Sequence, residues 1–305
     1  MSKQKENRWS NYALRIIVNT VSHPFEYAKV LIQIGYEPIA PTPTKTLFGK
    51  PAYKLPNIFE YVKHIKSVDG FRGCYVGMFP KISGNLLSAV VTQRLADYLE
   101  PPSEEENFDE ESSEEEKRIK YIKGVRCDLI THTAAIVVSQ PFHVITVRMM
   151  AQFVGRETKY IGLFGSIREV YQQNGVLGFF SGLVPRLLGD ILSLLLASSL
   201  TYAINRYLIE EKELKVYTSA TMTFVASAIT YPFQVVSNCM AVTNSGLMAG
   251  SRLMPHYTTW IDCWSDLASR NQLKRGSSLL IRYYVGPSII NDTLSSFPVQ
   301  EKYIS

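Results

Sequence analysis

The eight residues "SQPFHVIT", Ser139 to Thr146, place a proline in the middle of the apolar run "LITHTAAIVVSQPFHVITV". A proline inside a helix removes one amide donor, and its ring clashes with the preceding turn, so the helix kinks or breaks there. The feature recurs, because "SHPFEYAKV" contains Pro24 and "TYPFQVVSN" contains Pro232. The chain therefore contains internal repeats, which have to be settled before any other pattern is interpreted.

A second pattern follows the first two prolines. The stretches "SVDGFRGCYVGMFPK" (67–81) and "QQNGVLGFFSGLVPR" (172–186) each contain a glycine and a proline ten residues apart, with another glycine aligned between them: Gly70, Gly77 and Pro80 in the first, and Gly175, Gly182 and Pro185 in the second. The central prolines are 117 and then 91 residues apart. These spacings predict repeated units of about a hundred residues, with an insertion in the first.

The insertion is "EPPSEEENFDEESSEEE", residues 100 to 116, which has ten acidic residues and no basic one. A polar, self-repelling stretch without periodicity is typical of a disordered loop. We therefore divide the chain into a first repeat (1–99), a disordered acidic loop (100–117), a second repeat (118–210) and a third repeat (211–305). Outside residues 100–116 the chain has 32 basic and 17 acidic residues, which suits an anionic membrane surface or nucleic acid.

Several function classes find no support in the sequence. There is no zinc-finger spacing, basic helix or aromatic-interleaved basic strand, so we do not expect nucleic-acid binding. No nucleophile–base pair and no metal-ligand spacing occurs, so we expect no enzyme, no metal and no cofactor. The four cysteines are scattered and predict free thiols in a reducing compartment: Cys74, Cys127, Cys239 and Cys263. The N-terminus has no signal-peptide pattern, so any targeting signal is internal.

Five segments are candidates for crossing a membrane, which needs about 20 mostly apolar residues. They are residues 12–35, 77–98, 129–147, 187–204 and 218–236. Any one of them could instead be a buried helix of a soluble protein, but five at regular spacing argue against that alternative. A shorter amphipathic stretch lies between the spans of each repeat, at 57–68, 162–173 and 258–269. We expect these stretches to be helices along the membrane surface.

Each unit is thus a kinked span, an interfacial helix, a glycine-rich turn and a second span. This arrangement resembles the mitochondrial carrier family over nearly the whole chain. The family signature is P-x-[DE]-x-x-[KR], and the resemblance implies a six-helix barrel closed on one side by a ring of salt bridges. Repeat one keeps the signature at Pro24, Glu26 and Lys29, whereas the later repeats have Pro141, His143 and Thr146, and then Pro232, Gln234 and Ser237. We expect the salt-bridge ring to be largely lost, because only one repeat supplies both charges.

The third repeat is also truncated. Its last apolar run, "SSLLIRYYVG", is ten residues long and contains Arg282, and the chain becomes polar after Pro287. No membrane-spanning segment fits after Gly276. The expected fold is therefore an all-α membrane protein with a carrier-like threefold repeat. It is an opened bundle of five spanning helices with interfacial amphipathic helices, and its sixth helix is missing.

An opened barrel would turn a polar interior toward lipid, so a lateral hydrophilic groove is expected. The stretches "KVLIQIGYEP", "FHVITVRMMAQFVGRETKY", "GFFSGLVPRLLGDILSL" and "TYPFQVVSN" resemble the mitochondrial carrier homolog family. That resemblance implies a multi-pass protein of the mitochondrial outer membrane that inserts helical proteins, notably tail-anchored ones, and a docking role for apoptotic regulators. Lipid scrambling, a receptor role without insertion, and ordinary metabolite transport remain as alternatives. Client identity, membrane orientation and oligomeric state do not follow from the sequence.

Ionisable groups within spans are functional hypotheses by default. Three candidates for the groove come first. Lys29 could instead pair with Glu26, Asp190 could pair with Arg186 one turn earlier, and Tyr231 could be an interfacial aromatic. Three further groove candidates are His143, Arg148 and Asn238.

Overall fold

A computed structural model describes residues 2–45, 49–99, 114–207, 212–250 and 257–284. The chain is mostly helical. Its helices are α1 (Ser2–Ile34), α2 (Ile58–Gly73), α3 (Met78–Leu99), α4 (Glu114–Ala151), α5 (Gly162–Asn174), η1 (Val176–Phe180), α6 (Leu183–Tyr207), α7 (Lys212–Val242), η2 (Met248–Gly250) and α8 (Trp260–Ser269). The strands are β1 (Thr42–Lys45), β2 (Pro51–Leu55) and β3 (Arg282–Tyr283).

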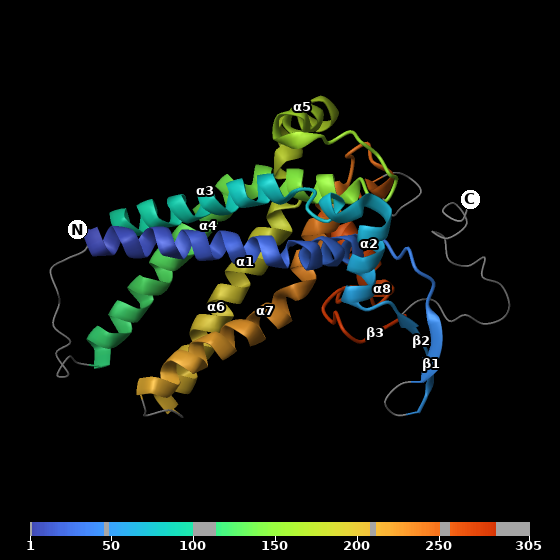
Figure 1. Ribbon diagram of the computed structural model, residues 1–305. Coiled ribbons are helices and arrows are strands. Elements are labelled where there is room, and N and C mark those ends of the chain that lie inside the picture. Colours follow the sequence, from blue (N-terminus) through green and yellow to red (C-terminus); the bar gives the residue numbers. More distant parts are fainter. Residues whose placement is uncertain (1, 46–48, 100–113, 208–211, 251–256, 285–305) are drawn as a thin grey trace.

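The long helices converge at one end and spread apart at the other, so they do not form a closed cylinder. Figure 1 shows α1, α3, α4, α6 and α7 converging at one end, near α2, α8 and the strands, and diverging toward the other end. Helix α3 packs along α4, and α6 packs along α7. At the converging end, α1 contacts both α4 and α7. The first helices of the three repeats, which are α1, α4 and α7, therefore meet at this end.

Among the described residues, three helical segments are long and apolar enough to cross a membrane: 118–151, 176–207 and 217–242, which belong to α4, η1–α6 and α7. Helices α1 and α3 have the length, with 33 and 22 residues. Their hydropathy is lowered by charges, among them Glu26, Lys29 and Lys81, which line an internal cavity rather than the outer surface. A helix of 22 residues is about 33 Å long, enough to cross the hydrocarbon core.

The central prolines lie inside α1, α4 and α7, which continue as helices on both sides of them. The side chain before each proline hydrogen bonds to a backbone carbonyl in the turn of its own repeat: His23 to Val76 (2.9 Å), Gln140 to Ser181 (2.9 Å) and Tyr231 to Arg275 (3.0 Å). Each carbonyl directly precedes a glycine with positive φ: Gly77 (79°), Gly182 (73°) and Gly276 (77°). The repeat is therefore preserved at this turn in all three units.

Close contacts between the paired helices depend on glycine. A Cβ at Gly84 of α3 would lie 2.8 Å from the Cβ of Phe142, and one at Gly189 of α6 would lie 2.7 Å from the Cβ of Phe233. Such small residues let helix backbones approach closely. Both phenylalanines directly follow the central proline of their helix. The matching residue of α1, Phe25, instead contacts Phe59 of α2, with ring centroids 5.6 Å apart.

The third repeat departs from the first two after its glycine. Helices α3 and α6 begin one residue after Gly77 and Gly182, whereas residues 277–284 leave Gly276 without forming a helix and end in β3. The expected absence of a sixth span therefore agrees with the structure as far as residue 284. Residues 285–305 lie outside the described part of the chain.

Residues 282 and 283 instead pair with β2 in a small antiparallel sheet of order β1–β2–β3, which no sequence pattern indicated. Its strands are only four, five and two residues long, too short to show an alternating pattern. Arg282 of β3 is buried, forms an ion pair with Glu37 and donates to the Pro56 carbonyl (2.9 Å). Burial raises the pKa of the Glu37 carboxyl, and the guanidinium of Arg282 opposes that shift.

The interfacial helices form where expected, and they differ in which side chains they bury. Helix α2 buries Tyr61 and Ile65, and α8 buries Leu267. Helix α5 instead buries Ser166 and Val170, and leaves Phe164 85% exposed. Three apolar side chains of α5 are exposed on its outer side: Phe164, Ile167 and Tyr171. An exposed apolar stripe is typical of a helix at a membrane surface.

The acidic segment largely lies outside the described residues, which resume at position 114. Residues 114–117, which we placed in the loop, are the first turn of α4. The proposed boundary at residues 210 and 211 also lies outside the described part of the chain.

Candidate functional site

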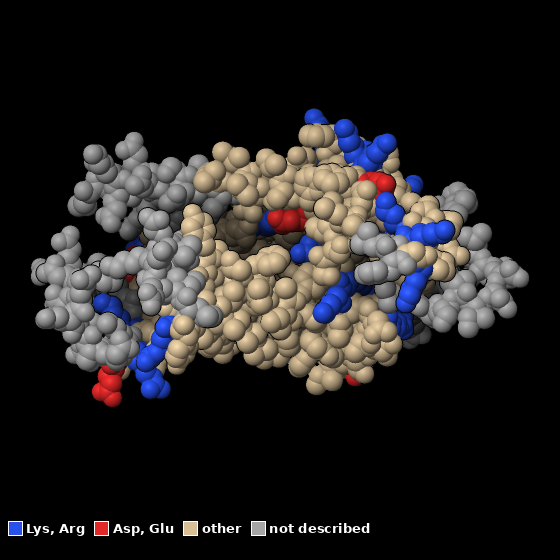
Figure 2. All heavy atoms as spheres, turned by 90° about the horizontal axis from the view of Figure 1, so that it is seen from below, with Lys and Arg blue, Asp and Glu red and all other residues tan. Residues whose placement is uncertain are grey.

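A polar cavity of about 580 Å³ lies between α1, α3, α4, α6 and α7. Figure 2, which views the molecule from below, shows a hollow in which acidic and basic atoms lie beneath an uncharged rim. The charged side chains that line the cavity are Glu26, Lys29, Lys81, Arg186 and Asp190. Its uncharged polar lining includes Gln33, Asn85, Ser139, His143, Thr146, Ser193, Ser227, Thr230, Tyr231, Gln234, Ser237 and Asn238. Three positive and two negative groups thus gather inside an otherwise apolar bundle.

Glu26 and Lys81 form an ion pair across α1 and α3. Glu26 also accepts a hydrogen bond from Ser22 (2.9 Å). The alternative pairing of Glu26 with Lys29 is therefore not the one that the structure shows. Lys81 directly follows Pro80, and its side chain is 15% exposed.

Lys29 contacts an aromatic ring instead of a carboxylate. Its Nζ lies 5.2 Å from the centroid of the Tyr231 ring, which brings α1 and α7 together across the cavity. A cation over a ring face is attracted by the ring quadrupole, with about 0.5–2 kcal/mol depending on desolvation. Lys29 is thus a positive charge of the cavity whose ammonium group is held beside the ring of Tyr231.

Arg186 and Asp190 lie one turn apart on α6 and both face the cavity. Arg186 donates from Nη1 to Oε1 of Gln140 (2.8 Å), the residue that precedes the proline of α4. Asp190 is exposed in the cavity and lies within electrostatic reach of Arg186 and His132. The alternative pairing of Asp190 with Arg186 is therefore not a contact ion pair. The two opposite charges lie near each other without direct contact.

The salt-bridge ring of the carrier signature is replaced by one ion pair and neutral contacts. In repeat one Glu26 pairs with Lys81. At the matching position of repeat two, Nε2 of His143 is buried and has no hydrogen-bond partner among the described residues. At that of repeat three, Gln234 is exposed in the cavity. The signature residues Pro24, Pro141 and Pro232 remain as helix-interior prolines, while the charges of the ring are mostly gone.

A polar network, here called the α1–α7 latch, joins the two helices between which a sixth helix would have to lie. Its members are Gln33, Tyr231, Asn238 and Arg275. Gln33 donates to the Tyr231 hydroxyl (2.9 Å) and accepts from Asn238 (2.7 Å). Arg275 donates from Nε to the Gln33 carbonyl (2.6 Å), and its own carbonyl accepts from Tyr231 (3.0 Å). Gln33, Tyr231 and Asn238 also line the cavity.

Arg148 does not belong to the cavity, contrary to our expectation. It is fully buried and donates to the Ala241 carbonyl (2.9 Å), the Tyr160 hydroxyl (3.2 Å) and the Asn174 side chain (2.9 Å). These partners come from α7, the loop before α5, and α5 itself. Arg148 therefore holds three elements together, and it acts through packing rather than through contact with a passing substrate. Lys29, Asp190, Tyr231, His143 and Asn238 do line the cavity.

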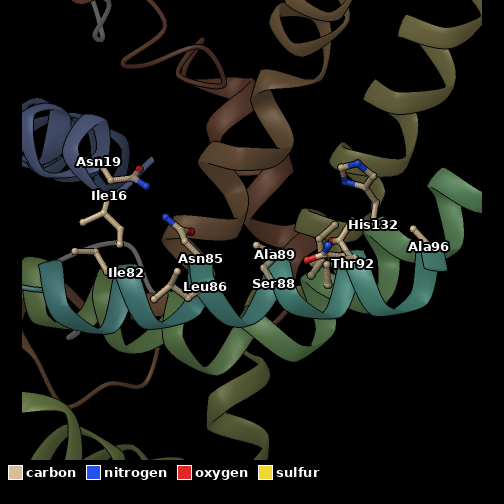
Figure 3. Close-up of a pocket in the computed structure, with 13 residues that line it drawn as sticks. Ile16, Asn19, Ile82, Asn85, Leu86, Ser88, Ala89, Thr92, Ala96 and His132 are labelled. Carbon is tan, nitrogen blue, oxygen red and sulfur yellow. The ribbon is translucent and has the colours of Figure 1, made fainter. Parts of the chain in front are cut away.

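A second cavity of about 660 Å³ extends along α3 toward the diverging end. In Figure 3 it is bordered by Asn19 and Ile16 of α1, by one face of α3 and by His132 of α4. Its polar lining consists of Asn19, Asn85, Ser88, Thr92, Gln93 and His132. Asn85 lines both cavities, so a polar surface runs from the charged cavity along α3.

Sequence reasoning missed Lys81, Arg186, Gln33 and Arg275 as site residues. The internal repeat held the signal for two of them, because Lys81 and Arg186 each follow the aligned prolines Pro80 and Pro185. Gln33 and Arg275 lie where the repeat pattern is weakest, so no such signal existed. Among the described residues, no group of three or more His, Cys, Asp or Glu side chains could hold a metal ion.

Comparisons with known proteins agree with this architecture. The family model for mitochondrial carrier protein matches residues 13–100 and 118–212. Mitochondrial carrier homolog 2 of Mus musculus and that of Homo sapiens are each 44% identical over 271 residues, covering 86% of this chain and 89% of the relative. Mitochondrial carrier homolog 1 of Mus musculus is 36% identical over 293 residues, covering 88% of this chain and 75% of the relative.

Proposed function

We propose that this chain, which belongs to the mitochondrial carrier homolog family, inserts α-helical proteins into the mitochondrial outer membrane. Tail-anchored proteins are the clients that we propose in particular. The chain is a mitochondrial membrane protein of carrier-like fold. The outer membrane, the multi-pass topology and the insertase activity are parts of the proposal. The observation that carries it is the charged cavity, bounded by five helices.

The physical problem of insertion is the polar end of the client. A tail-anchored protein must move a short polar segment through about 30 Å of hydrocarbon while its apolar helix enters lipid. Each unsatisfied polar group costs several kcal/mol in hydrocarbon. A cavity lined by Lys29, Asp190 and neutral polar groups supplies hydration and hydrogen-bond partners to that segment. Its polar lining continues along α3, which gives the segment a path toward the diverging end.

The apolar helix of the client needs a lateral exit. In the second and third repeats, the phenylalanine after the central proline packs on a glycine in the last helix of the preceding repeat: Phe142 on Gly84 of α3, and Phe233 on Gly189 of α6. Phe25 of α1 has no such partner helix among the described residues and contacts Phe59 of α2 instead. We therefore place the exit between α1 and α7, above the α1–α7 latch.

The alternatives use the same cavity in different ways. Metabolite transport of the ordinary carrier type depends on a charged ring that opens and closes, and within the described part of the chain only Glu26 and Lys81 form a contact ion pair in the cavity. Lipid scrambling is a second candidate, because a charged cavity open to lipid would also accept phospholipid headgroups. A receptor role for apoptotic regulators, without insertion, would leave the cavity charges without effect.

The test is insertion into liposomes that contain the purified protein, with a tail-anchored client, a labelled lipid and a small solute followed side by side. Insertion is measured by protease protection of the client per folded molecule. We expect Lys29→Glu and Asp190→Arg to change the insertion rate by about threefold or more, in either direction, because each reverses a charge inside the cavity. Solute exchange should stay undetectable.

A matched control is Lys63→Glu, which reverses an exposed charge on α2 outside the cavity. It should leave the insertion rate unchanged. If both cavity variants insert the client at the parental rate, the cavity is not the pathway and the receptor role takes first place. If they change lipid movement alone, scrambling is the activity of the cavity.

A further inference from the structure

Two buried polar atoms of the charged cavity have no hydrogen-bond partner among the described residues. They are Nε2 of His143 on α4 and Oδ1 of Asn238 on α7, and both residues line the cavity. Asn238 is 3% exposed, and its other polar side-chain atom is already engaged, because Nδ2 donates to Gln33 (2.7 Å). Buried polar groups are nearly always paired, so two unpaired atoms in one cavity indicate a ligand that pairs with them.

An ammonium group lies beside the same part of the cavity. Gln33, which accepts from Asn238, also donates to the hydroxyl of Tyr231 (2.9 Å). Nζ of Lys29 lies 5.2 Å from the centroid of that tyrosine ring, and Lys29 precedes Gln33 by one turn of α1. Lys29, His143 and Asn238 thus come from α1, α4 and α7, the helices that meet at the converging end.

The charges of the cavity leave Lys29 as the cation without a carboxylate partner among the described residues. Glu26 forms its ion pair with Lys81, and Asp190 lies within electrostatic reach of Arg186. The three positive and two negative side chains of the lining give a net charge of +1. An anion that enters the cavity therefore gains most beside Lys29.

The chemistry of these three groups selects the ligand. An ammonium group only donates, an imidazole nitrogen donates in one of its two tautomers, and an amide oxygen only accepts. A carboxylate can accept from Lys29 and His143 together, but Asn238 needs a donor next to that carboxylate. The last residue of a polypeptide has both groups, an α-carboxylate and its own backbone N–H. A lipid phosphodiester offers acceptors only and would leave the Asn238 oxygen unpaired.

We propose that Lys29, His143 and Asn238 form a binding site for the free C-terminus of a client polypeptide. Lys29 and Nε2 of His143 donate to the terminal carboxylate, and Oδ1 of Asn238 accepts from the N–H of the last residue. This inference rests on the proposed function, because a tail-anchored client has to move its C-terminus across the membrane. The terminal carboxylate is a charge that every such client carries, and a charge is costly to move through hydrocarbon, so a site for it inside the bundle lowers the barrier.

The first test measures binding without insertion. The full chain is held in nanodiscs of phosphatidylcholine and titrated with a short glycine–serine peptide that has an uncharged dye at its N-terminus. We expect the peptide with a free carboxylate to bind about tenfold more tightly than the same peptide ending in a carboxamide, because hydrogen bonds to a charged group carry at least that factor. In Lys29→Gln, the ratio should fall to about twofold or less. Lys63→Gln, at an exposed position of α2, is the matched control and should keep the parental ratio.

His143 separates a binding role from a structural one. His143→Phe removes a nitrogen that has no partner in the described protein, so thermal stability should be unchanged or higher, while the ratio between the two peptides falls. His143→Gln keeps a donor and should retain most of the ratio. A residue with a merely structural role would change stability and leave the ratio alone.

The second test places the two endings on a tail-anchored client in the liposome assay. The ratio of their insertion rates should differ from one in the parent and approach one in Lys29→Gln. The proposal is overturned if the parent binds both peptides equally, if Lys29→Gln discriminates as well as Lys63→Gln, or if N-acetylglycine binds as tightly as the peptide, which would mark a site for small carboxylates. If the peptides are distinguished but neither client is inserted, the site stands and the proposed function fails.

Discussion

Tyr231 contributes two hydrogen bonds to the α1–α7 latch through a single hydroxyl, which accepts from Gln33 and donates to the Arg275 carbonyl. Tyr231→Phe removes both while keeping the ring beneath Lys29. Each such bond contributes about 0.5–1.5 kcal/mol, so the free energy of unfolding should fall by roughly 1–3 kcal/mol. Thermal unfolding in detergent measures the change. Tyr217→Phe, on the same helix but 71% exposed, is the control, and equal losses in the two variants would contradict the role of the latch.

Substitution of Arg148 should lower the stability of the protein without changing the insertion rate per folded molecule. Its buried guanidinium bonds to α7, to Tyr160 and to α5, so Arg148→Met leaves two buried partners and the half-buried Asn174 side chain without this donor. We expect a loss of about 3 kcal/mol or more in unfolding free energy, seen as a lower yield of folded protein. Insertion per folded molecule should stay at the parental rate. Arg168→Met, at an exposed position of α5, should affect neither quantity. If Arg148→Met lowered insertion per folded molecule, Arg148 would have to take part in insertion, which would contradict its purely structural role.

Polar residues on apolar helices were visible in the sequence, but their direction was not. Asp190, His143 and Asn238 face the cavity, as expected, because α6, α4 and α7 turn one polar stripe inward. Arg148 lies only five residues beyond His143, yet it faces α5, an element whose position no local pattern reveals. Hydrophobic periodicity predicts which residues share a face of a helix. It does not predict which other element packs against that face.

At the scale of elements, the pairing of α6 with α7 rests on the contact between Gly189 and Phe233. Gly189→Ala places a Cβ 2.7 Å from the Cβ of Phe233, so the two helices have to separate. Overpacking of this kind costs about 1–3 kcal/mol, more than the helix propensity gained by alanine. The melting temperature should fall accordingly.

Gly165→Ala on α5 is the matched control, because nothing lies within 4 Å of its added Cβ. It should be neutral or slightly stabilising. If Gly189→Ala is no less stable than Gly165→Ala, then α6 and α7 do not depend on this close approach. Gly84→Ala on α3, facing Phe142, should behave like Gly189→Ala, since the two positions match in the repeat.

The elements themselves were predictable to different degrees. The prolines and the glycine turns located α1, α4 and α7 and the starts of α3 and α6, because proline and positive-φ glycine have few alternatives. The sheet was not predictable, since β3 has two residues and its place depends on Arg282 reaching Glu37 and Pro56. The burial of Ser166 on α5 was not predictable either, because no local pattern shows which small polar residue faces the bundle.

At the scale of the whole molecule, the helices of a carrier-like repeat diverge from one end instead of closing into a barrel. The three turns before Gly77, Gly182 and Gly276 keep the threefold pattern at the converging end. The charges that would form a closing ring are reduced to one contact ion pair, and the α1–α7 latch connects the helices on the side where the third repeat changes course. A bundle held at one end and splayed at the other suits a protein that releases a client sideways into lipid.

The most direct test of the central claim is to ask which surface the client touches during insertion. A photo-crosslinking amino acid is placed at Gln234, which is exposed in the cavity, or at Phe224, which lies on the same helix, is 75% exposed and lines neither cavity. A tail-anchored client is then added to liposomes and irradiated before insertion is complete. The account predicts client crosslinks from position 234, lost when insertion has finished, and none above background from position 224. Crosslinks from position 224 alone, or equal crosslinks from both, would contradict passage through the cavity.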